Sequence, residues 1–256
     1  MQISKGLYSL ELAVPVFGRV NVIHPAVIID EQGSLLIDTG YPGNLQLIQS
    51  AFETNDITLS SLDSIILTHQ DIDHIGSLSA LLETATEAIE VFASELEKPY
   101  IEGVKPLIKV TPTSIERAVA NLPADTSPEA RAAFKHRLEN PPKGPVNTIL
   151  SDGQVIDRCG GITVIFTPGH TPGHLSLYHA SSKTLLAGDA MVVADGLLQG
   201  PIPAYCSDYP LALQSLKKFT EFDIQQVLCY HGGLVMDNVN ERIAELAQAA
   251  DAAPTE

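Results

Sequence analysis

Short apolar runs separated by turn signals fill the first third of the chain. The runs at 6–12, 19–29 and 34–37 are bounded by polar or glycine-containing turns, which predicts strands of an antiparallel sheet. A helix is expected over 44–52, after a glycine-rich turn, and the run 64–68 predicts a short, buried strand. The chain therefore begins as sheet and then alternates helix with strand.

The same alternation continues to the C-terminal end. A helix is predicted over 75–82 and a brief strand over 91–93, followed later by strands at 162–167, 175–179, 184–187 and 226–230 and by helices at 211–222 and 240–249. Strands and helices recur in two similar halves, which predicts a layered α/β fold with sheets at its centre. The pattern leaves open whether the strands form a sandwich of two sheets or one mixed sheet.

The segment 98–145 interrupts this alternation. It holds eight prolines and several charges, with helical pieces near 114–121 and 128–138. One domain is the default for 256 residues of which 45% are apolar. We therefore interpret 98–145 as an insertion in a single domain that spans 1–256.

Charge and composition narrow the class of partner. The chain has 31 acidic against 15 basic residues, a formal net charge of −16, whereas nucleic-acid binding needs Lys and Arg to neutralise phosphates. Residues 1–5 show no secretion signal and no apolar run reaches membrane-spanning length, so a cytoplasmic protein is expected, with neither nucleic acid nor membrane as partner. Cys159, Cys206 and Cys229 lack metal or redox spacing and are predicted to be reduced.

Four potential metal ligands follow the predicted strand 64–68 within six residues: His69, Asp71, Asp73 and His74. Alternate positions of an extended chain face one side, so His69 and Asp71 can meet one ion while the following turn presents Asp73 and His74 to a second. Any one of these residues taken singly is more simply explained as part of a polar loop. The density of the set indicates a metal site.

Potential metal ligands also follow three further predicted strands. The loop 167–174 presents His170 from a glycine- and proline-fixed turn, while His174 begins the next strand and is better placed to support the site by hydrogen bonding. Asp189 and His231 each follow an apolar strand. A lone Asp or His at a strand end is usually an ordinary loop residue, so the prediction rests on all four elements together.

This order of motifs, His-x-x-x-Asp-His, Pro-Gly-His-Thr-x-Gly-His, Gly-Asp and a final His, resembles the metallo-β-lactamase superfamily over nearly the whole chain. The resemblance implies an αββα sandwich with the metals in a cleft along one edge of the two sheets. The Asp-Thr-Gly sequence that begins at Asp38 matches a loop beneath the family's metal site, where this aspartate would orient a histidine ligand. An aspartate before a turn is also an ordinary turn former.

The resemblance further implies two divalent ions. The first would be bound by His69, Asp71 and His170, and the second by Asp73, His74 and His231. Asp189 would bridge the two ions. The family's commonest pattern has a histidine where this chain has Asp71. Zinc is the expected metal, but a carboxylate is a harder ligand and shifts the preference toward manganese or iron, which are the alternatives. A second alternative is that Asp71 does not bind and only one ion is retained.

The chemistry that such a site favours is hydrolysis. A metal-bridging hydroxide would be the nucleophile, held by Asp73, which would also accept its proton, because no Ser or Cys stands in a nucleophile motif. The absence of Trp and the scarcity of basic residues favour a small ester, lactone or thioester over a phosphodiester. Acyl-homoserine lactonases of the family place a tyrosine just after the bridging aspartate, whereas this chain has Met191, Val192 and Val193 there.

Two long segments, 98–145 and 196–209, are expected to wall the site and set substrate choice. Tyr100, Tyr205 and Tyr209 lie in these segments and could offer a phenol, although a tyrosine near proline is more often a packing residue. The apolar loop that ends at Tyr209 is compatible with a homodimer.

Two alternatives come from other functional classes. An iron-dependent redox enzyme similar to flavodiiron proteins or persulfide dioxygenases would suit Asp71, but an electron-transfer role would need a separate partner, because the chain has no attached flavin-binding domain. A non-catalytic metal-binding protein on the same scaffold is the other, and the intact ligand set argues against it. A thioester hydrolase resembling glyoxalase II would need a basic patch for its anionic thiol, and the sequence shows no clear one.

Overall fold

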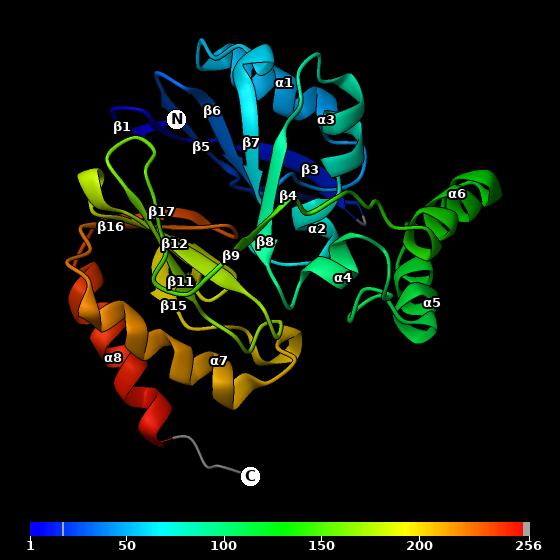
Figure 1. Cartoon of the computed structure of the whole chain (residues 1–256). Coiled ribbons are helices and arrows are strands. Elements are labelled where there is room, and N and C mark those ends of the chain that lie inside the picture. The colour runs from blue at the N-terminus through cyan, green and yellow to red at the C-terminus, as the bar shows by residue number, and fades with distance from the viewer. Residues whose placement is uncertain (17, 253–256) are drawn as a thin grey trace.

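Two β-sheets pack face to face, and helices cover the outer face of each (Figure 1). The structure, a computed structural model, describes residues 1–16 and 18–252. The αββα sandwich implied by the sequence is confirmed, and the strands form two separate sheets rather than one mixed sheet.

The first sheet has seven strands in the order β1-β2-β5-β6-β7-β8-β9. Neighbours are antiparallel from β1 to β6 and parallel from β6 to β9. The bounds are β1 Gln2–Ser4, β2 Leu7–Ser9, β5 Ala26–Asp30, β6 Gly33–Ile37, β7 Leu62–Ile66, β8 Glu90–Ser94 and β9 Thr148–Leu150.

The second sheet has six strands in the order β10-β11-β12-β13-β16-β17, and only β13 and β16 are parallel. Two small ribbons, β3 with β4 and β14 with β15, lie outside both sheets. The bounds are β3 Leu12–Val16, β4 Arg19–Ile23, β10 Val155–Ile156, β11 Ile162–Phe166, β12 Leu175–His179, β13 Thr184–Gly188, β14 Val192–Ala194, β15 Leu197–Gln199, β16 Gln226–Cys229 and β17 Gly233–Val235.

Helices and 3-10 turns connect these strands. The α-helices are α1 Leu45–Thr54, α2 Ile72–Ile75, α3 Leu78–Thr84, α4 Lys98–Ile101, α5 Pro112–Ala120, α6 Pro128–Glu139, α7 Tyr209–Ser215 and α8 Val239–Ala252. The 3-10 turns are η1 Leu59–Ser61, η2 Ala180–Ser182, η3 Pro203–Tyr205 and η4 Leu216–Glu221. None of the described helices is both long and apolar enough to cross a bilayer.

Several predicted elements have different boundaries in the structure, and two of these differences have a clear local cause. The strand expected over 19–29 splits into β4 and β5 around Pro25, which has no N–H to give to a sheet. The helix expected over 75–82 overlaps the last residue of α2 and most of α3, and these two helices are separated at Gly76, whose N–H donates to the carbonyl of Gly40 (2.8 Å). A Cβ at Gly76 would lie 2.3 Å from the backbone nitrogen of Pro42, so only glycine permits this contact.

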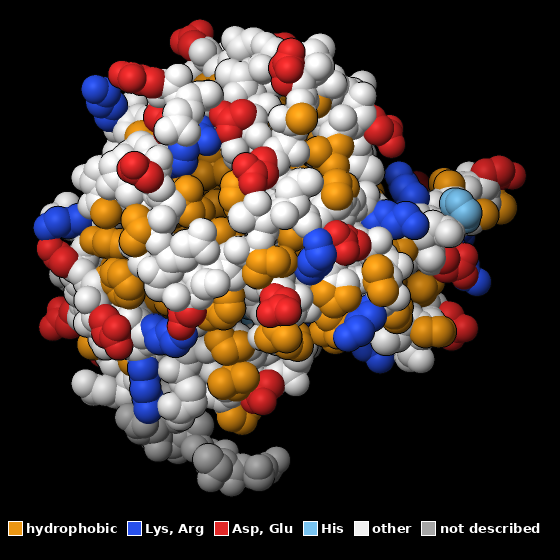
Figure 2. All heavy atoms as spheres, in the orientation of Figure 1, with side chains coloured by type: hydrophobic (Ala, Val, Ile, Leu, Met, Phe, Trp, Pro, Cys, Tyr) orange, Lys and Arg blue, Asp and Glu red, His pale blue; other side chains and the backbone are white. Residues whose placement is uncertain are grey.

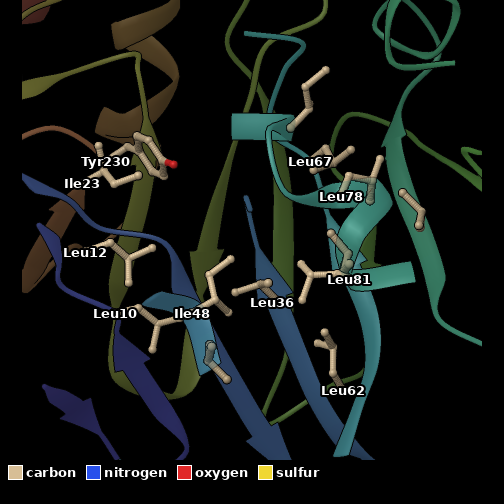
Figure 3. Close-up of a cluster of buried hydrophobic side chains, with 14 of the residues drawn as sticks. Leu10, Leu12, Ile23, Leu36, Ile48, Leu62, Leu67, Leu78, Leu81 and Tyr230 are labelled. Atoms are coloured by element: carbon tan, nitrogen blue, oxygen red, sulfur yellow. The ribbon is translucent and has the colours of Figure 1, made fainter. Parts of the chain in front are cut away.

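Alternation along the strands distributes apolar side chains between three clusters. Ile37 and Ile66 face the space between the sheets, while their neighbours Leu36 and Ile65 point outward. Figure 3 shows Leu36 beside Ile48 of α1 in the outer cluster, which covers the first sheet. The third cluster packs α7 and α8 on the outer face of the second sheet. The sandwich therefore fixes the relative position of the two sheets, and with it the edge where the polar strand ends meet.

The segment 98–145 contains α4, α5 and α6 before the chain returns to the first sheet through β9. Figure 1 shows α5 and α6 side by side, projecting away from the sheets. No described residue of α6 is buried, and Figure 2 shows acidic, basic and apolar side chains mixed on this projection. Whether 98–145 is an insertion in one domain stays a prediction.

Candidate metal centre

The polar strand ends come together at one edge of the sandwich. β6 and β7 are parallel, as are β13 and β16, so the loops that follow all four strands lie on the same side. The turn between β11 and β12 joins them there, since β12 runs antiparallel to β13. Segments up to about 160 residues apart in sequence meet in this way: Tyr230 donates its hydroxyl proton to the carbonyl of Asp73, 157 positions earlier.

Four of the predicted ligands form a first group. His69, Asp71, His170 and Asp189 offer ligand atoms that all lie within 4.8 Å of one another. Asp71 Oδ2 is 3.3 Å from His69 Nε2 and 3.0 Å from His170 Nε2. Asp189 Oδ2 lies 3.3 Å from His170 Nε2. A tetrahedral ion with bonds of about 2.0–2.1 Å places its ligand atoms about 3.3–3.4 Å apart, so the spacing suits one ion.

The other three predicted ligands, Asp73, His74 and His231, form a second group on the same distance criterion. His231 Nε2 is 3.3 Å from Asp73 Oδ2, and His74 Nε2 is 4.0 Å from the same oxygen. Asp189 also reaches this group, with Oδ1 3.4 Å from His74 Nε2 and Oδ2 3.6 Å from His231 Nε2. Asp189 is therefore placed between the two groups.

The structure thus brings all seven predicted ligands together, in the two sets expected from the sequence. Three of their buried polar atoms, His69 Nε2, His74 Nε2 and Asp189 Oδ1, have no hydrogen-bond partner among the described residues. Leaving a buried polar atom without a partner costs free energy, and a bound cation would remove that cost at all three. The donor set therefore fits divalent metal, while the role of each residue as a ligand stays a prediction.

Electrostatics prepare these groups to hold positive charge. Burial alone would raise the pKa of Asp71, but neighbouring His69, His170 and Lys109 hold it well below its usual range. Burial is likewise outweighed at Asp189, where His231 and His74 hold the pKa well down. Burial, with the charge of His74, lowers the pKa of His69, which keeps that ring neutral. Ionised carboxylates and a neutral imidazole are the protonation states in which these groups bind metal.

Asp38 holds the second group in place, as the resemblance implied. Its Oδ2 lies 2.8 Å from His74 Nδ1 and accepts a hydrogen bond from the Thr68 hydroxyl, while Oδ1 accepts from the Thr68 backbone N–H, both at 2.8 Å. Pairing Nδ1–H with a carboxylate would leave Nε2 of His74 as the ring atom that can bind an ion. The ring of Tyr230 stacks on His74 with centroids 3.8 Å apart, which fixes its orientation.

We expect Asp38→Asn to weaken metal binding about 10- to 100-fold, the usual cost of losing such a supporting carboxylate. Asparagine tolerates the positive φ of 63° at this position. Asp56→Asn is a matched control, because Asp56 is exposed and has a similar φ of 56°. Competition with a chromophoric chelator measures both affinities, and equal affinity in the two variants would contradict the role given to Asp38.

His174 supports the site rather than joining either group, as expected. Its Nε2 accepts a hydrogen bond from the backbone N–H of Asp189 (3.0 Å), and Nδ1 lies 2.8 Å from Thr167 Oγ1. Burial and neighbouring histidines hold the pKa of His174 well below its usual range, consistent with a neutral acceptor. A Cβ at Gly188 would lie 2.8 Å from Nε2, so this strand end needs glycine for the approach.

A cavity of about 440 Å³ opens above the two groups. Besides five of the proposed ligands it is lined by Asn21, Tyr41, Lys109, Val192, Ile202 and Tyr205. Both segments expected to form walls contribute, through Lys109 and through Ile202 with Tyr205. Tyr100 lines a different cavity and Tyr209 packs in the outer core of the second sheet, so of the three tyrosines considered only Tyr205 reaches the site.

Three lining residues, Asn21, Tyr41 and Lys109, were not predicted from the sequence. Asn21 donates to the Tyr41 hydroxyl (3.1 Å), and burial together with the charge of Asp73 raises the pKa of Tyr41, which keeps its phenol protonated. Lys109 contacts Asp71 directly. Tyr41 follows the Asp-Thr-Gly loop by one residue, which was the only available hint for it, whereas Lys109 lies in a loop with no recognisable motif.

Known proteins resemble the chain over most of its length. A family model described as the metallo-beta-lactamase superfamily matches residues 19–231. "Probable metallo-hydrolase YflN" of Bacillus subtilis (strain 168) is 29% identical, covering 95% of this chain and 90% of the relative. An "N-acyl homoserine lactonase" of Bacillus sp. is 25% identical over 75% of this chain and 72% of its own. A metallo-beta-lactamase family protein from Thermus thermophilus superposes with a TM-score of 0.68 at 23% identity, covering 98% of this chain and 81% of that one.

Proposed function

The chain belongs to the metallo-β-lactamase superfamily as a metallo-hydrolase, and we propose that it cleaves small esters, lactones or thioesters with the help of two divalent ions. The observation that carries this proposal is the pair of ligand groups with Asp189 between them, in which buried atoms of three ligands have no hydrogen-bond partner in the described part of the chain. His69, Asp71 and His170 would hold the first ion, and Asp73, His74 and His231 the second, with zinc as the expected metal.

Two bound ions would supply a shared hydroxide at neutral pH and positive charge for the oxygen that becomes anionic on attack. The protein's own groups do the rest. Asp73 lines the cavity and is the carboxylate that would orient the nucleophile and accept its proton. Asp38 and Tyr230 orient His74, and His174 holds the backbone of Asp189, so the site is organised before substrate binds.

The cavity favours a small substrate of mixed polarity. Its volume of about 440 Å³ lies within the range of small-molecule sites. Val192 and Ile202 offer apolar contact, while Tyr41 and Tyr205 place phenols at the same cavity. Tyr41, protonated at neutral pH and hydrogen-bonded to Asn21, is the better placed donor for a leaving group.

Similarity to an N-acyl homoserine lactonase supports the inclusion of lactones. A lactonase of that type has less support, because Met191 and two valines follow the bridging aspartate where a tyrosine would be expected. A phenol from Tyr41 or Tyr205 would have to replace it from another segment of the cavity wall. We therefore do not restrict the substrate class to acyl-homoserine lactones.

Asp71 favours one second candidate, an iron-dependent redox enzyme. Its carboxylate lies within the first ligand group and would suit a harder metal than zinc. Bound iron together with oxygen consumption would favour this candidate over hydrolysis.

The metal content and the activity of the wild-type protein test the proposal together. We expect about two divalent ions per chain after purification without chelators. The substrates to be tested are chromogenic esters, lactones, thioesters and phosphodiesters. We expect turnover of at least one ester, lactone or thioester and no turnover of the phosphodiesters. Chelation should abolish turnover and added zinc should restore it. Metal-free protein that hydrolyses the same substrate at the same rate would contradict the proposal.

A further inference from the structure

A lysine occupies the first ligand group. Lys109 Nζ lies 2.5 Å from Asp71 Oδ2 and 2.7 Å from His170 Nε2. These are two of the atoms that would bind the first ion. In the described part of the chain no Lys or Arg makes a comparable contact with Asp73, His74 or His231. The two groups therefore differ in that, among the described residues, a lysine ammonium group contacts only the first.

Buried hydrogen bonds fix the backbone beside Lys109. The N–H of Ile108 donates to Gln70 Oε1 (2.8 Å), and both the backbone and the side-chain amide of Gln70 donate to Glu97 Oε2. Gln70 and Glu97 are fully buried, and Gln70 stands between two of the proposed ligands. The Ser114 hydroxyl also donates to the carbonyl of Lys109 (2.8 Å). The loop is therefore tied to the ligand segment itself, so the position of the ammonium group is built into the site.

The ammonium group and a first ion compete for the same atoms. The Nε2 of a neutral imidazole has one lone pair, which can accept a proton from Lys109 or bind metal, but not both. A divalent ion this close to the ammonium would also repel it in a partly buried site. Without the ion, the lysine compensates the charge of half-buried Asp71. The Lys109 side chain is 28% exposed and lines the cavity, so it has room to move aside.

We propose that Lys109 is a built-in competitor for the first ion, so that the two metal positions fill in order. The second group, His74 with Asp73 and His231, binds an ion without displacing a lysine, whereas the first ion has to displace the ammonium group from Asp71 and His170. This inference rests on the proposed two-ion function and adds to it an unequal affinity set by one residue.

Metal titration of the chelator-treated full chain tests the proposal without any activity assay. Zn²⁺ is added in competition with a chromophoric chelator to the wild type, Lys109→Met and Lys105→Met. We expect one tight and one weak site in the wild type, separated by about tenfold or more, the scale of a hydrogen bond to a charged group. Lys109→Met should strengthen the weak site by about the same factor and leave the tight site unchanged.

Lys105→Met is the matched control, because Lys105 lies on the same loop but faces the ring of Tyr100. It should titrate like the wild type. Lys109→Arg keeps the charge and should keep the weak site, which preserves the test if Lys109→Met fails to fold. Two sites whose affinities are the same in the wild type and in Lys109→Met would overturn the role of Lys109 and leave the two-ion proposal standing. Absence of zinc binding in every variant would overturn both.

Discussion

Asp189→Ala is expected to lower kcat/KM on the hydrolysed substrate by about 10³-fold or more, and the metal content from two ions to at most one. Asp189 is the one proposed ligand whose two oxygens approach histidines of both groups. Its loss removes a shared anionic ligand, and metal ions supply several kcal/mol of transition-state stabilisation. Steady-state kinetics and elemental analysis of the same preparation measure both effects.

Asp125→Ala is a suitable control for this change, because Asp125 is exposed in the loop between α5 and α6. It should keep the wild-type activity and metal content. Asp189→Ala protein that keeps two ions and wild-type kcat/KM would show that Asp189 is not a bridge, even though it lies between the groups.

Asp73→Asn is expected to lower kcat by about 10²- to 10⁴-fold with little change in KM, the range usual for the loss of a positioned proton acceptor. Asparagine keeps the shape of the side chain and an oxygen that can face His231, 3.3 Å from Asp73 Oδ2 in the wild type. It cannot accept the proton of the nucleophile. The ion that His69, Asp71 and His170 would hold should be retained, which elemental analysis checks alongside the kinetics.

The kinetic pattern separates two explanations for a loss of activity in Asp73→Asn. If the variant retains metal and loses kcat, Asp73 accepts the proton. If metal is lost in proportion to activity, Asp73 acts as a ligand alone. A kcat within tenfold of the wild type would remove Asp73 from the mechanism altogether. Asp125→Asn controls for the general effect of an Asp-to-Asn change.

Several strands of the second sheet could be predicted from the sequence, because the local pattern of apolar residues determines where they lie. β12 lies where apolar residues predicted it, and β11, β13 and β16 agree to within a residue at each end. Short elements with little pattern were missed, among them β9, β10 and the ribbon of β14 with β15. A strand of two or three residues carries too few alternating positions to be distinguished from a turn.

The division into two sheets had to come from tertiary packing. Alternation tells which residues of a strand share a face, but not which sheet that face meets. The side chains of Ile37 and Ile66 pack in one cluster with apolar residues of the second sheet, such as Leu186, which lies far from them in the sequence. The break at Gly76 has the same origin, because the group that interrupts the helix is the carbonyl of Gly40, in another loop.

The sequence by itself determined the set of seven candidate ligands, because each lies in a local motif that follows an apolar strand. Tertiary structure alone decided what surrounds them. Lys109 reaches Asp71 from 38 positions away, and Asn21 reaches Tyr41 from a ribbon outside both sheets. Contacts of this kind depend on how loops of different elements pack, and no periodicity within either segment encodes them.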